Sequence, residues 1–325
     1  MSNNKYKVSL FLDKKRWDSF IDSSPQGNIF VTSNFIESLL DKYYLWTVSK
    51  DNEILCGAII IKNGNKLNVG QYPYTMYQGI MFSTHLLDLP FHKRIVTQSE
   101  LVKVLINRLT DKYRCVSLCI HHNFEDLREI QWHNYHSPEL GQFQIGLRYT
   151  GIVELNKYKS FDDYLSQISV NRFYKYKKAK TELTLKETKD IEILDRLHNL
   201  TFKRQGIKRS TKEKKLLRSI TSSALKFKYG RLYICTNKNN IPMSATLFLY
   251  YKQTAYYLFG ANHPKYRQSN SGTFLMLENI RIALEEGYKF IDMCGINSPN
   301  RGDFKISLNA KPIAYYIATW KQPNN

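Results

Sequence analysis

The 325-residue sequence has few cysteines, few prolines and no long apolar run. Its five cysteines form no Cys-x-x-Cys pair and mostly lie in apolar, strand-like stretches, which indicates buried free thiols in a reducing compartment. No window approaches the roughly 20 consecutive apolar residues of a transmembrane helix, and the first residues lack the apolar core of a signal peptide. We therefore expect a cytoplasmic protein without a transmembrane segment.

Motifs for covalent catalysis and for metal binding are also missing. No serine or cysteine nucleophile stands in a motif with a base. The histidine spacing matches no common set of zinc ligands, although four of these residues cluster in one part of the chain: His121, His122, His133 and His136. No metal site is therefore expected.

Charge of one sign dominates, with 48 Lys and Arg against 28 Asp and Glu and a net charge of +20. Such a charge favours a polyanionic partner, namely tRNA, a nucleotide-linked precursor or, by peripheral contact, an anionic membrane surface. The basic residues are spread along the whole chain, so a basic surface with no dedicated partner fits equally well. A hydrophobic content of 42% nevertheless indicates a globular protein.

The apolar pattern predicts one order of elements twice, which indicates an α/β (α+β) protein with domains at residues 1–150 and 151–325. In the first half we expect a short helix over Lys14–Ser23, strands at 44–50, 54–62 and 66–70 with an Asn63-Gly64 hairpin, a helix over Glu100–Lys112 and a strand over Cys115–Ile120. In the second half we expect helices over Phe161–Lys180 and Ile191–Gln205, strands at 231–237, 242–251 and 254–262, a helix over Gly272–Gly287 and a strand over Lys289–Gly295. A last strand, Tyr315–Trp320, can return to pack on the first domain.

Residues 254–305 carry the most specific pattern. A tyrosine-rich strand, a Leu-rich helix that ends in Gly-Tyr, an Asp-x-x-Gly strand end and a Phe-Lys pair follow one another: Tyr256-Tyr257, Leu275–Gly287-Tyr288, Asp292–Gly295 and Phe304-Lys305. The loop before the helix presents backbone N–H groups that suit a phosphate or another anion. In this order the pieces resemble the donor-binding core of the GNAT acyltransferases, and more narrowly the FemABX-type aminoacyltransferases and their relatives in polysaccharide loci.

The resemblance implies tandem GNAT-like domains, each a mixed twisted sheet flanked by helices, with the acceptor side in the first domain and the donor side in the second. It implies direct attack by the amino group of a cell-envelope precursor, an amino sugar or a peptide, on an acyl or aminoacyl donor. No tightly bound cofactor is implied, and the donor is aminoacyl-tRNA or acyl-CoA. The pattern Arg267…Asn270…Gly272 has Asn270 where acetyl-CoA enzymes have glycine, which favours tRNA but leaves the donor open.

The same resemblance assigns roles to particular residues. The expected catalytic residues are Lys305, Tyr256 and Tyr257, with Arg301 assisting, although strand alternation allows only one of the two tyrosines to face the cleft. The expected donor-binding residues are Phe259, Gly260, Ala261, Arg267, Asn270, Gly272 and Phe304. The expected acceptor-binding residues are Arg204, which suits a phosphate, and Tyr74 and Tyr77. Lys208, Arg209, Lys212, Lys214 and Lys215 would extend the basic surface in this interpretation, although a solvated helical face explains most of them better.

Two other hypotheses remain open at this point. One is a non-catalytic module that binds RNA or another polyanion on a GNAT scaffold. The stretch Arg172–Lys180, which interleaves aromatic and basic residues, would suit RNA, but it fits better a packed helix with a basic edge. The other is an acetyl-CoA-dependent N-acetyltransferase that acts on a small-molecule amine.

Overall fold

The structure is a computed structural model that describes residues 5–62 and 72–323, so the predicted strand 66–70 and the Asn63-Gly64 hairpin lie outside the described residues. The chain packs into two compact units. Unit 1 comprises residues 1–148 and 314–325, and unit 2 comprises residues 149–313. Among the described residues, no helix has both the length and the apolar character needed to cross a membrane.

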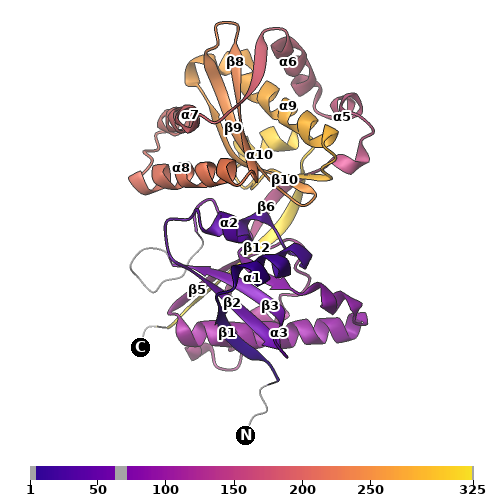
Figure 1. Cartoon of the computed structure of the whole chain (residues 1–325), viewed down its shortest axis with the longest axis vertical. Coiled ribbons are helices and arrows are strands. Elements are labelled where there is room, and N and C mark those ends of the chain that lie inside the picture. The colour runs from indigo at the N-terminus through magenta and orange to yellow at the C-terminus, as the bar shows by residue number, and fades with distance from the viewer. Residues whose placement is uncertain (1–4, 63–71, 324–325) are drawn as a thin grey trace. The chain divides into compact units, whose positions relative to one another are not determined.

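Unit 1 is built on an antiparallel sheet with the strand order β1-β2-β3-β4 (Figure 1). Its strands are β1 (Lys7–Phe11), β2 (Tyr43–Lys50), β3 (Glu53–Ile61), β4 (Gly79–Phe82) and β5 (Cys115–Ile120). Its helices are α1 (Lys14–Ser23), α2 (Ser33–Ile36), α3 (Phe91–Lys112) and α4 (Arg128–Trp132), with short 3-10 turns at Ile29–Val31, Thr84–Asp88 and Pro138–Leu140.

Both faces of this sheet are covered. On one face α1 sets Trp17 and Phe20 against Gly57 of β3, where an added Cβ would lie 3.0 Å from either ring. On the other face the apolar side of α3, with Leu101 and Leu105, shares a core cluster with Trp46 of β2. The predicted start of α3 at Glu100 is wrong, because the helix begins at Phe91 with a polar turn that carries little apolar periodicity.

The end of the chain also belongs to unit 1. The strand β12 (Lys311–Lys321) pairs antiparallel with β5, with Tyr316 opposite Ile120 and Trp320 opposite Val116. The bounds of β12 and of β6 (Gln144–Glu154) show that both strands carry the chain from one unit into the other. The sequence predicted the final strand, whereas β6 was missed.

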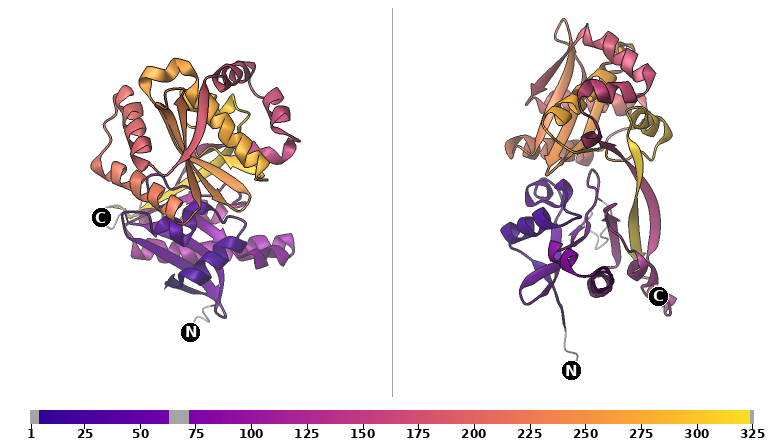
Figure 2. Two further views of the ribbon diagram at one scale, coloured as in Figure 1. Left: turned by 45° about the horizontal axis from the view of Figure 1, so that its top comes forward. Right: turned by 90° about the vertical axis from the view of Figure 1, so that its right-hand side faces the viewer.

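Unit 2 contains a mixed sheet in the order β6-β11-β10-β9-β8-β7. Besides β6, its strands are β7 (Leu183–Thr188), β8 (Gly230–Asn237), β9 (Pro242–Tyr251), β10 (Thr254–Asn262) and β11 (Phe290–Asp292). Its helices are α5 (Phe161–Gln167), α6 (Val170–Lys180), α7 (Ile191–Arg204), α8 (Thr211–Lys226), α9 (Ser271–Glu285) and α10 (Pro299–Ile306), with 3-10 turns at Leu155–Lys157 and Pro264–Ser269. Figures 1 and 2 show α7 and α8 on one face of the sheet and α9, with α5 and α6, on the other.

The central helix of unit 2 is α9, which is buried on most sides and mostly apolar. Its buried residues include Phe274, Leu277 and Ile280, which join a core cluster with Tyr176 of α6 and Ala255 of β10. A helix that is apolar on most sides must be covered on most sides, and α5, α6 and the sheet provide that cover. The predicted helix Gly272–Gly287 and strands 231–237, 242–251 and 254–262 are confirmed within one or two residues.

One prediction for unit 2 needs correction, and a second gains its bounds. The single helix expected over Phe161–Lys180 is two helices, because the chain turns at Ile168 and Ser169, whose N–H donates to the Ser307 carbonyl. For the lysine-rich stretch that forms α8, the sequence predicted a solvated helical face without bounds, and the capping box between Ser210 and Glu213 marks where this helix begins.

Candidate active site

The middle strands of unit 2 run together and then separate. β10 and β11 are parallel, with Thr254 opposite Phe290 and Tyr256 opposite Asp292. β11 ends at Asp292, whereas β10 continues to Asn262 paired with β9 alone. Beyond Tyr256, therefore, no described strand covers the β11 side of β10. The parallel pairing predicted from the sequence is confirmed.

A bulge in β10 determines which side chains lie at this point. The register shifts between Tyr257 and Phe259, so Leu258 is the extra residue and Tyr257 and Gly260 share a face. A Cβ at Gly260 would lie 1.6 Å from the Tyr257 hydroxyl oxygen, so the phenol occupies the space that any larger residue would need. Burial raises the pKa of Tyr257 to about 12, which keeps this hydroxyl neutral and able to donate a hydrogen bond.

Lys305 of α10 lies at the end of β11. Its Nζ donates hydrogen bonds to the carbonyls of Met293 (2.6 Å) and Gly295 (2.7 Å), and it lies 5.3 Å from the centre of the Tyr257 ring. Tyr257 is thus the tyrosine on the Lys305 side, while Tyr256, one residue earlier, is directed to the opposite face and is buried. The structure brings together Lys305, Tyr257 and Gly260 from the predicted set.

The electrostatics of Lys305 follow from its surroundings. Burial lowers the pKa of its ammonium, the nearby Cys294 and Asp292 raise it, and Arg301 lowers it. An ammonium has three N–H donors. The two backbone carbonyls leave one of them without an acceptor among the described residues.

Asp292 and Thr150 fix the turn that presents those two carbonyls. The buried Asp292 carboxylate accepts hydrogen bonds from the Thr150 hydroxyl (2.5 Å) and from the N–H of Cys294 (2.8 Å), and the Thr150 oxygen accepts from the N–H of Gly295 (3.2 Å). Cys294 and Gly295 both have positive φ, 52° and 97°, which makes the turn sharp. The sequence pattern pointed to Asp292, but Thr150 lies 142 residues earlier, in the strand that was missed.

The start of α9 has the geometry of an anion-binding loop. Asn270 adopts the left-handed conformation, with φ 61°, so asparagine here supplies the geometry for which glycine is usual. A Cβ at Gly272 would lie 2.5 Å from the Asn262 side-chain oxygen. The N–H groups of Gly272 and Thr273 have no acceptor among the described residues, and Arg267 is exposed nearby in the preceding turn.

Arg172 of α6 is a site residue that the sequence placed only in a stretch weighed between RNA contact and a packed helix. Its Nε donates to the Ser307 hydroxyl (2.8 Å), its Nη1 donates to the Thr273 hydroxyl (3.3 Å), and its guanidinium lies 4.6 Å from the centre of the Phe304 ring. It therefore joins α10 to the start of α9, and Phe304 packs against this cation. The packed helix predicted for this stretch is confirmed, with Tyr176 buried.

Arg204, the last residue of α7, is exposed. Its helix is tied to the end of β10, because the Thr201 hydroxyl accepts from the N–H of Asn262 and lies 3.0 Å from the Asn262 carbonyl. Asn262 in turn contacts Gly272. Arg204 therefore extends from a helix that is held next to the start of α9.

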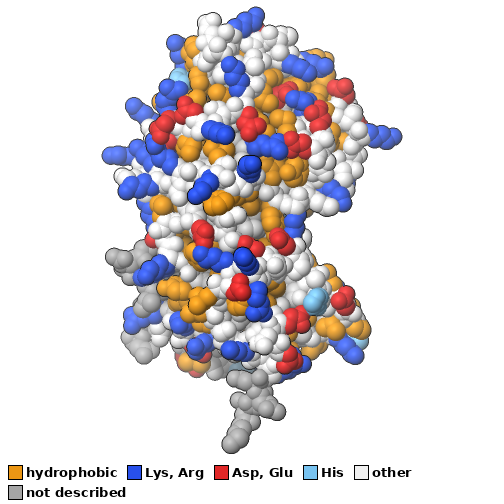
Figure 3. All heavy atoms as spheres, in the orientation of Figure 1, with side chains coloured by type: hydrophobic (Ala, Val, Ile, Leu, Met, Phe, Trp, Pro, Cys, Tyr) orange, Lys and Arg blue, Asp and Glu red, His pale blue; other side chains and the backbone are white. Residues whose placement is uncertain are grey.

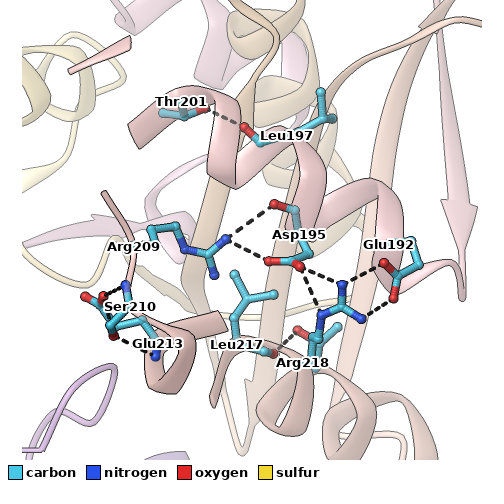
Figure 4. Close-up of polar contacts among 10 residues, drawn as sticks. Glu192, Asp195, Leu197, Thr201, Arg209, Ser210, Glu213, Leu217 and Arg218 are labelled. Carbon is cyan, nitrogen blue, oxygen red and sulfur yellow. Dashed lines mark hydrogen bonds and ion pairs between the residues drawn. The ribbon is translucent and has the colours of Figure 1, made fainter. Parts of the chain in front are cut away.

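The prediction that Arg209 extends the basic surface is wrong. Its side chain is 0% exposed, and Nη1 donates to a carboxylate oxygen of Asp195 at 2.7 Å. Figure 4 shows that Arg218 of α8 binds the same carboxylate and also Glu192. Burial alone would raise the pKa of Asp195, but the two guanidinium groups outweigh it and hold this pKa below its ordinary value. The network stabilises the fold, because it connects α7, the loop after α7 and α8 through ion pairs.

The basic charge is not concentrated in one patch on the face that Figure 3 shows. Lys and Arg side chains are scattered there among Asp, Glu and hydrophobic side chains. Several form ion pairs with half-exposed or exposed partners, for example Lys5 with Glu100 and Arg128 with Asp126. Such pairs contribute little, about 0–1 kcal/mol each. The net charge therefore identifies no binding surface by itself.

The predicted acceptor-binding tyrosines lie in unit 1. Tyr74 is half-buried and Tyr77 is 0% exposed, and both have positive φ, 59° and 50°. The Tyr77 ring packs against His121, His122 and Tyr315. This position fits core packing rather than contact with an acceptor. In the described residues, no group of three or more His, Cys, Asp or Glu side chains could hold a metal ion.

Three antiparallel strands, a helix and a strand that separates from the third define the GNAT fold, and this order recurs as β2-β3-β4-α3-β5 and β8-β9-β10-α9-β11. Solved structures agree. FemX is similar with a TM-score of 0.69 and 13% identity over 95% of this chain and 96% of that one. A tandem GNAT protein from the clavulanic acid biosynthesis pathway is similar with a TM-score of 0.58 and 8% identity, over 98% of this chain and 100% of that one. The C-terminal domain of a putative lysylphosphatidylglycerol synthetase from Agrobacterium fabrum is similar with a TM-score of 0.55 and 9% identity, over 94% of this chain and 91% of that one.

A family model provides the narrower assignment. Residues 158–311 match the FemAB family, which spans every element of unit 2 from α5 to α10. No curated protein sequence matches the chain. The resemblance predicted from the sequence is confirmed for residues 158–311, which match the FemAB family, and over nearly the whole chain the fold is similar to that of FemX and of a tandem GNAT protein.

Proposed function

We propose that the chain moves an acyl or aminoacyl group to an amino group of a cell-envelope precursor, an amino sugar or a peptide, in the cytoplasm. The observation that carries this proposal is the position of Lys305 at the separation of β10 and β11, against Tyr257 and two backbone carbonyls. The match of unit 2 to the FemAB family supports it. Unit 2 would bind the donor, and unit 1 would contribute residues that bind the acceptor.

The proposed reaction needs alignment and charge stabilisation rather than an enzyme nucleophile. The amine attacks an ester or thioester carbonyl, whose oxygen gains negative charge in the transition state. Backbone N–H groups of Phe259–Ala261 and the remaining N–H of Lys305 would stabilise that oxygen. The neutral hydroxyl of Tyr257, which burial keeps protonated at neutral pH, would give its proton to the leaving oxygen or sulfur and would regain one from the amine, which loses a proton as the new bond forms.

The donor belongs to one of two classes, aminoacyl-tRNA or acyl-CoA, and neither is a tightly bound cofactor. Both carry phosphates, for which we propose the start of α9 together with Arg267 and Arg204. Structural neighbours include FemX and the tandem GNAT protein named above, whose structure was solved without AcCoA, so the fold alone does not choose between the classes. The net charge of +20 favours tRNA and is also compatible with peripheral contact with an anionic membrane.

Donor consumption tests the proposal. The full-length protein is incubated with acetyl-CoA, and separately with tRNA charged with a mixture of labelled amino acids, each with and without glucosamine or a lysine-containing peptide as acceptor. We expect one donor to raise the melting temperature and to lose its acyl group faster when an amine is present. Neither donor being bound or consumed would contradict the proposal.

A pair of variants separates donor binding from chemistry. Arg204→Ala and Arg267→Ala should raise KM for the donor and leave kcat within a few fold, because these side chains are proposed to bind phosphates rather than the reacting carbonyl. A loss confined to kcat would remove both residues from the donor site.

A further inference from the structure

Unit 1 contains a pocket at the place where its own middle strands end. The pocket has a volume of about 350 Å³, at the lower end of the range for small-molecule sites. Its walls come from the loop after α1, the end of β4, the turn before α3, α3 itself and the segment after β5. The lining residues are Pro25, Gln26, Phe82, Ser83, Leu87, Gln98, His122, Asn123, Phe124 and Glu125.

Gln26 lines this pocket and is held by the backbone at two strand ends. Its side-chain oxygen accepts a hydrogen bond from the N–H of Phe82 (3.1 Å), at the end of β4, and its side-chain N–H donates to the carbonyl of Asn123 (3.2 Å), beyond the end of β5. In unit 2 the corresponding strand end is the place proposed for the acyl carbonyl. Because Gln26 already uses the backbone N–H of Phe82, a ligand in this pocket can be bound but not activated there.

One polar group faces the pocket without a partner. The residue Gln98 of α3 is only 8% exposed, and its carboxamide makes no hydrogen bond to the described residues. The carboxamide opens onto the pocket, so a ligand that offers both a donor and an acceptor could pair with it there. Ser83 offers its O–H nearby, because its oxygen already accepts from the N–H of His85.

The apolar wall excludes a flat ligand. The rings of Phe82 and Phe124 stack on each other, with centroids 5.4 Å apart and an angle of 19° between the planes. A nucleobase would need a slot between two ring faces, and here the rings occupy that space themselves. Phe82 and Phe124 are only 3% and 7% exposed, so most of the open apolar surface of the pocket comes from Leu87, which is 46% exposed, and this surface suits the C–H groups of a saturated ring.

The charge of the lining excludes an anion. Glu125 is the charged residue among those that line the pocket, and its partner Arg94, 3.3 Å away, stands outside the lining. A phosphate or a free carboxylate would meet a carboxylate and amides but no cation of its own. In a protein of net charge +20, a lining of this kind selects against the phosphorylated ligands that the rest of the surface attracts.

We propose that this pocket binds one monosaccharide unit, neutral or amine-bearing and not phosphorylated. Its hydroxyl or acetamido group pairs with the carboxamide of Gln98, and its C–H face lies against Leu87 on the apolar wall. A ring amine or further hydroxyls are placed toward Glu125. The site is a binding site without chemistry of its own, and it does not depend on the acyl transfer proposed above.

Saturation-transfer NMR on the full-length protein tests this inference. Glucose, glucosamine, N-acetylglucosamine and glucose 6-phosphate are compared without any acyl donor, so the outcome is independent of transferase activity. We expect saturation of at least one of the first three sugars and at least tenfold weaker binding of glucose 6-phosphate. No saturation of any unphosphorylated sugar, or equal binding of the phosphorylated one, would overturn the proposal.

Matched variants locate the binding. Gln98→Leu should weaken the sugar at least tenfold, whereas Gln131→Leu, at an exposed position on α4, should leave it unchanged. Glu125→Gln, at a half-exposed side chain that tolerates substitution, should reduce the preference for glucosamine over glucose several-fold. Unchanged affinity in both Gln98→Leu and Glu125→Gln would place the sugar elsewhere and refute the site.

Discussion

In unit 1 the carboxamide of Gln26 spans the ends of β4 and β5, whereas in unit 2 the corresponding strand ends carry Lys305 and Tyr257. The order of strands and helices is the same in both. In unit 1 a neutral side chain occupies the backbone hydrogen-bonding groups at the strand ends. In unit 2 a cation with an unused N–H lies at the corresponding strand ends. The difference teaches that the fold supplies the strand separation, while single side chains decide whether it can serve chemistry.

The largest expected effect concerns Lys305, the cation at the strand ends of unit 2 that has no counterpart among the described residues of unit 1. Lys305→Met keeps the length of the side chain and removes its charge and donors. We expect kcat to fall by roughly 10³-fold, as for other groups that stabilise a developing oxyanion. The exposed Lys289 provides the control, and Lys289→Met should keep full activity. Activity in Lys305→Met within tenfold of the original would remove the main difference between the units.

The variant must be shown to be folded, because Lys305 also binds two carbonyls. Loss of its donors leaves the carbonyls of Met293 and Gly295 without their partner, at a cost of about 1–3 kcal/mol. Kinetics are therefore measured well below the melting temperature of Lys305→Met, with circular dichroism as the check.

The next effect concerns buried charge, which unit 2 holds in its Asp195 network. Asp195→Ala leaves the buried Arg209 without its counter-ion, so we expect a loss of about 3–5 kcal/mol in the free energy of unfolding. Asp126→Ala in unit 1 breaks a pair with the exposed Arg128 and should cost about 0–1 kcal/mol. Urea denaturation measures both. Similar losses in the two variants would mean that Arg209 is solvated.

A third prediction concerns pH and the buried His198 of α7. Burial lowers the pKa of His198 to about 4, against about 6.5 in the unfolded chain. Between these values the unfolded state binds the extra proton, so the stability of unit 2 should fall as pH drops from 6.5 towards 4, by on the order of 3 kcal/mol. His198→Leu should flatten this dependence, and His92→Gln, at an exposed site, should not. The same slope in all three proteins would contradict a neutral His198.

The smallest effect tests the bulge in β10. Gly260→Ala places a Cβ against the Tyr257 hydroxyl and must displace it. We expect kcat to fall about tenfold, equivalent to about 1.4 kcal/mol, with donor affinity largely kept. Gly146→Ala in β6 is the matched strand variant, since its Cβ would meet only ordinary contact at 3.8 Å. Full activity of Gly260→Ala would show that the position of Tyr257 does not matter.

Local pattern predicted the parts of the fold that local physics determines. The apolar spacing of α7 and α9 and the aromatic strands β8–β10 depend on neighbours a few residues away, and their bounds agree closely with the structure. The same holds for Asn270, whose left-handed geometry is an intrinsic preference of asparagine. Tyr257 and Lys305 were proposed from a resemblance, but their mutual position depends on a bulge that no local signal predicts.

What the sequence did not reveal depends on partners distant in the chain. Thr150 and Arg172 become site residues through contacts with Asp292 and Ser307, more than a hundred residues away. The sequence neighbours of Arg209 are basic and polar, which is typical of an exposed segment. Only the folded structure brings the Asp195 carboxylate into hydrogen-bonding distance of Arg209. Burial of a charge requires the partner to be known, and composition does not supply that partner.

Hydrogen–deuterium exchange with a bound donor tests the difference between the two units most directly. The full-length protein is compared with and without a saturating non-transferable donor, either desulfo-CoA or tRNA carrying an amide-linked amino acid. The account predicts slower exchange at residues 257–262, 271–274 and 293–305 of unit 2, and unchanged exchange at residues 24–28, 81–84 and 120–126 of unit 1. Protection of the unit 1 segments with none in unit 2 would contradict the assignment of the donor to the strand ends beside Lys305.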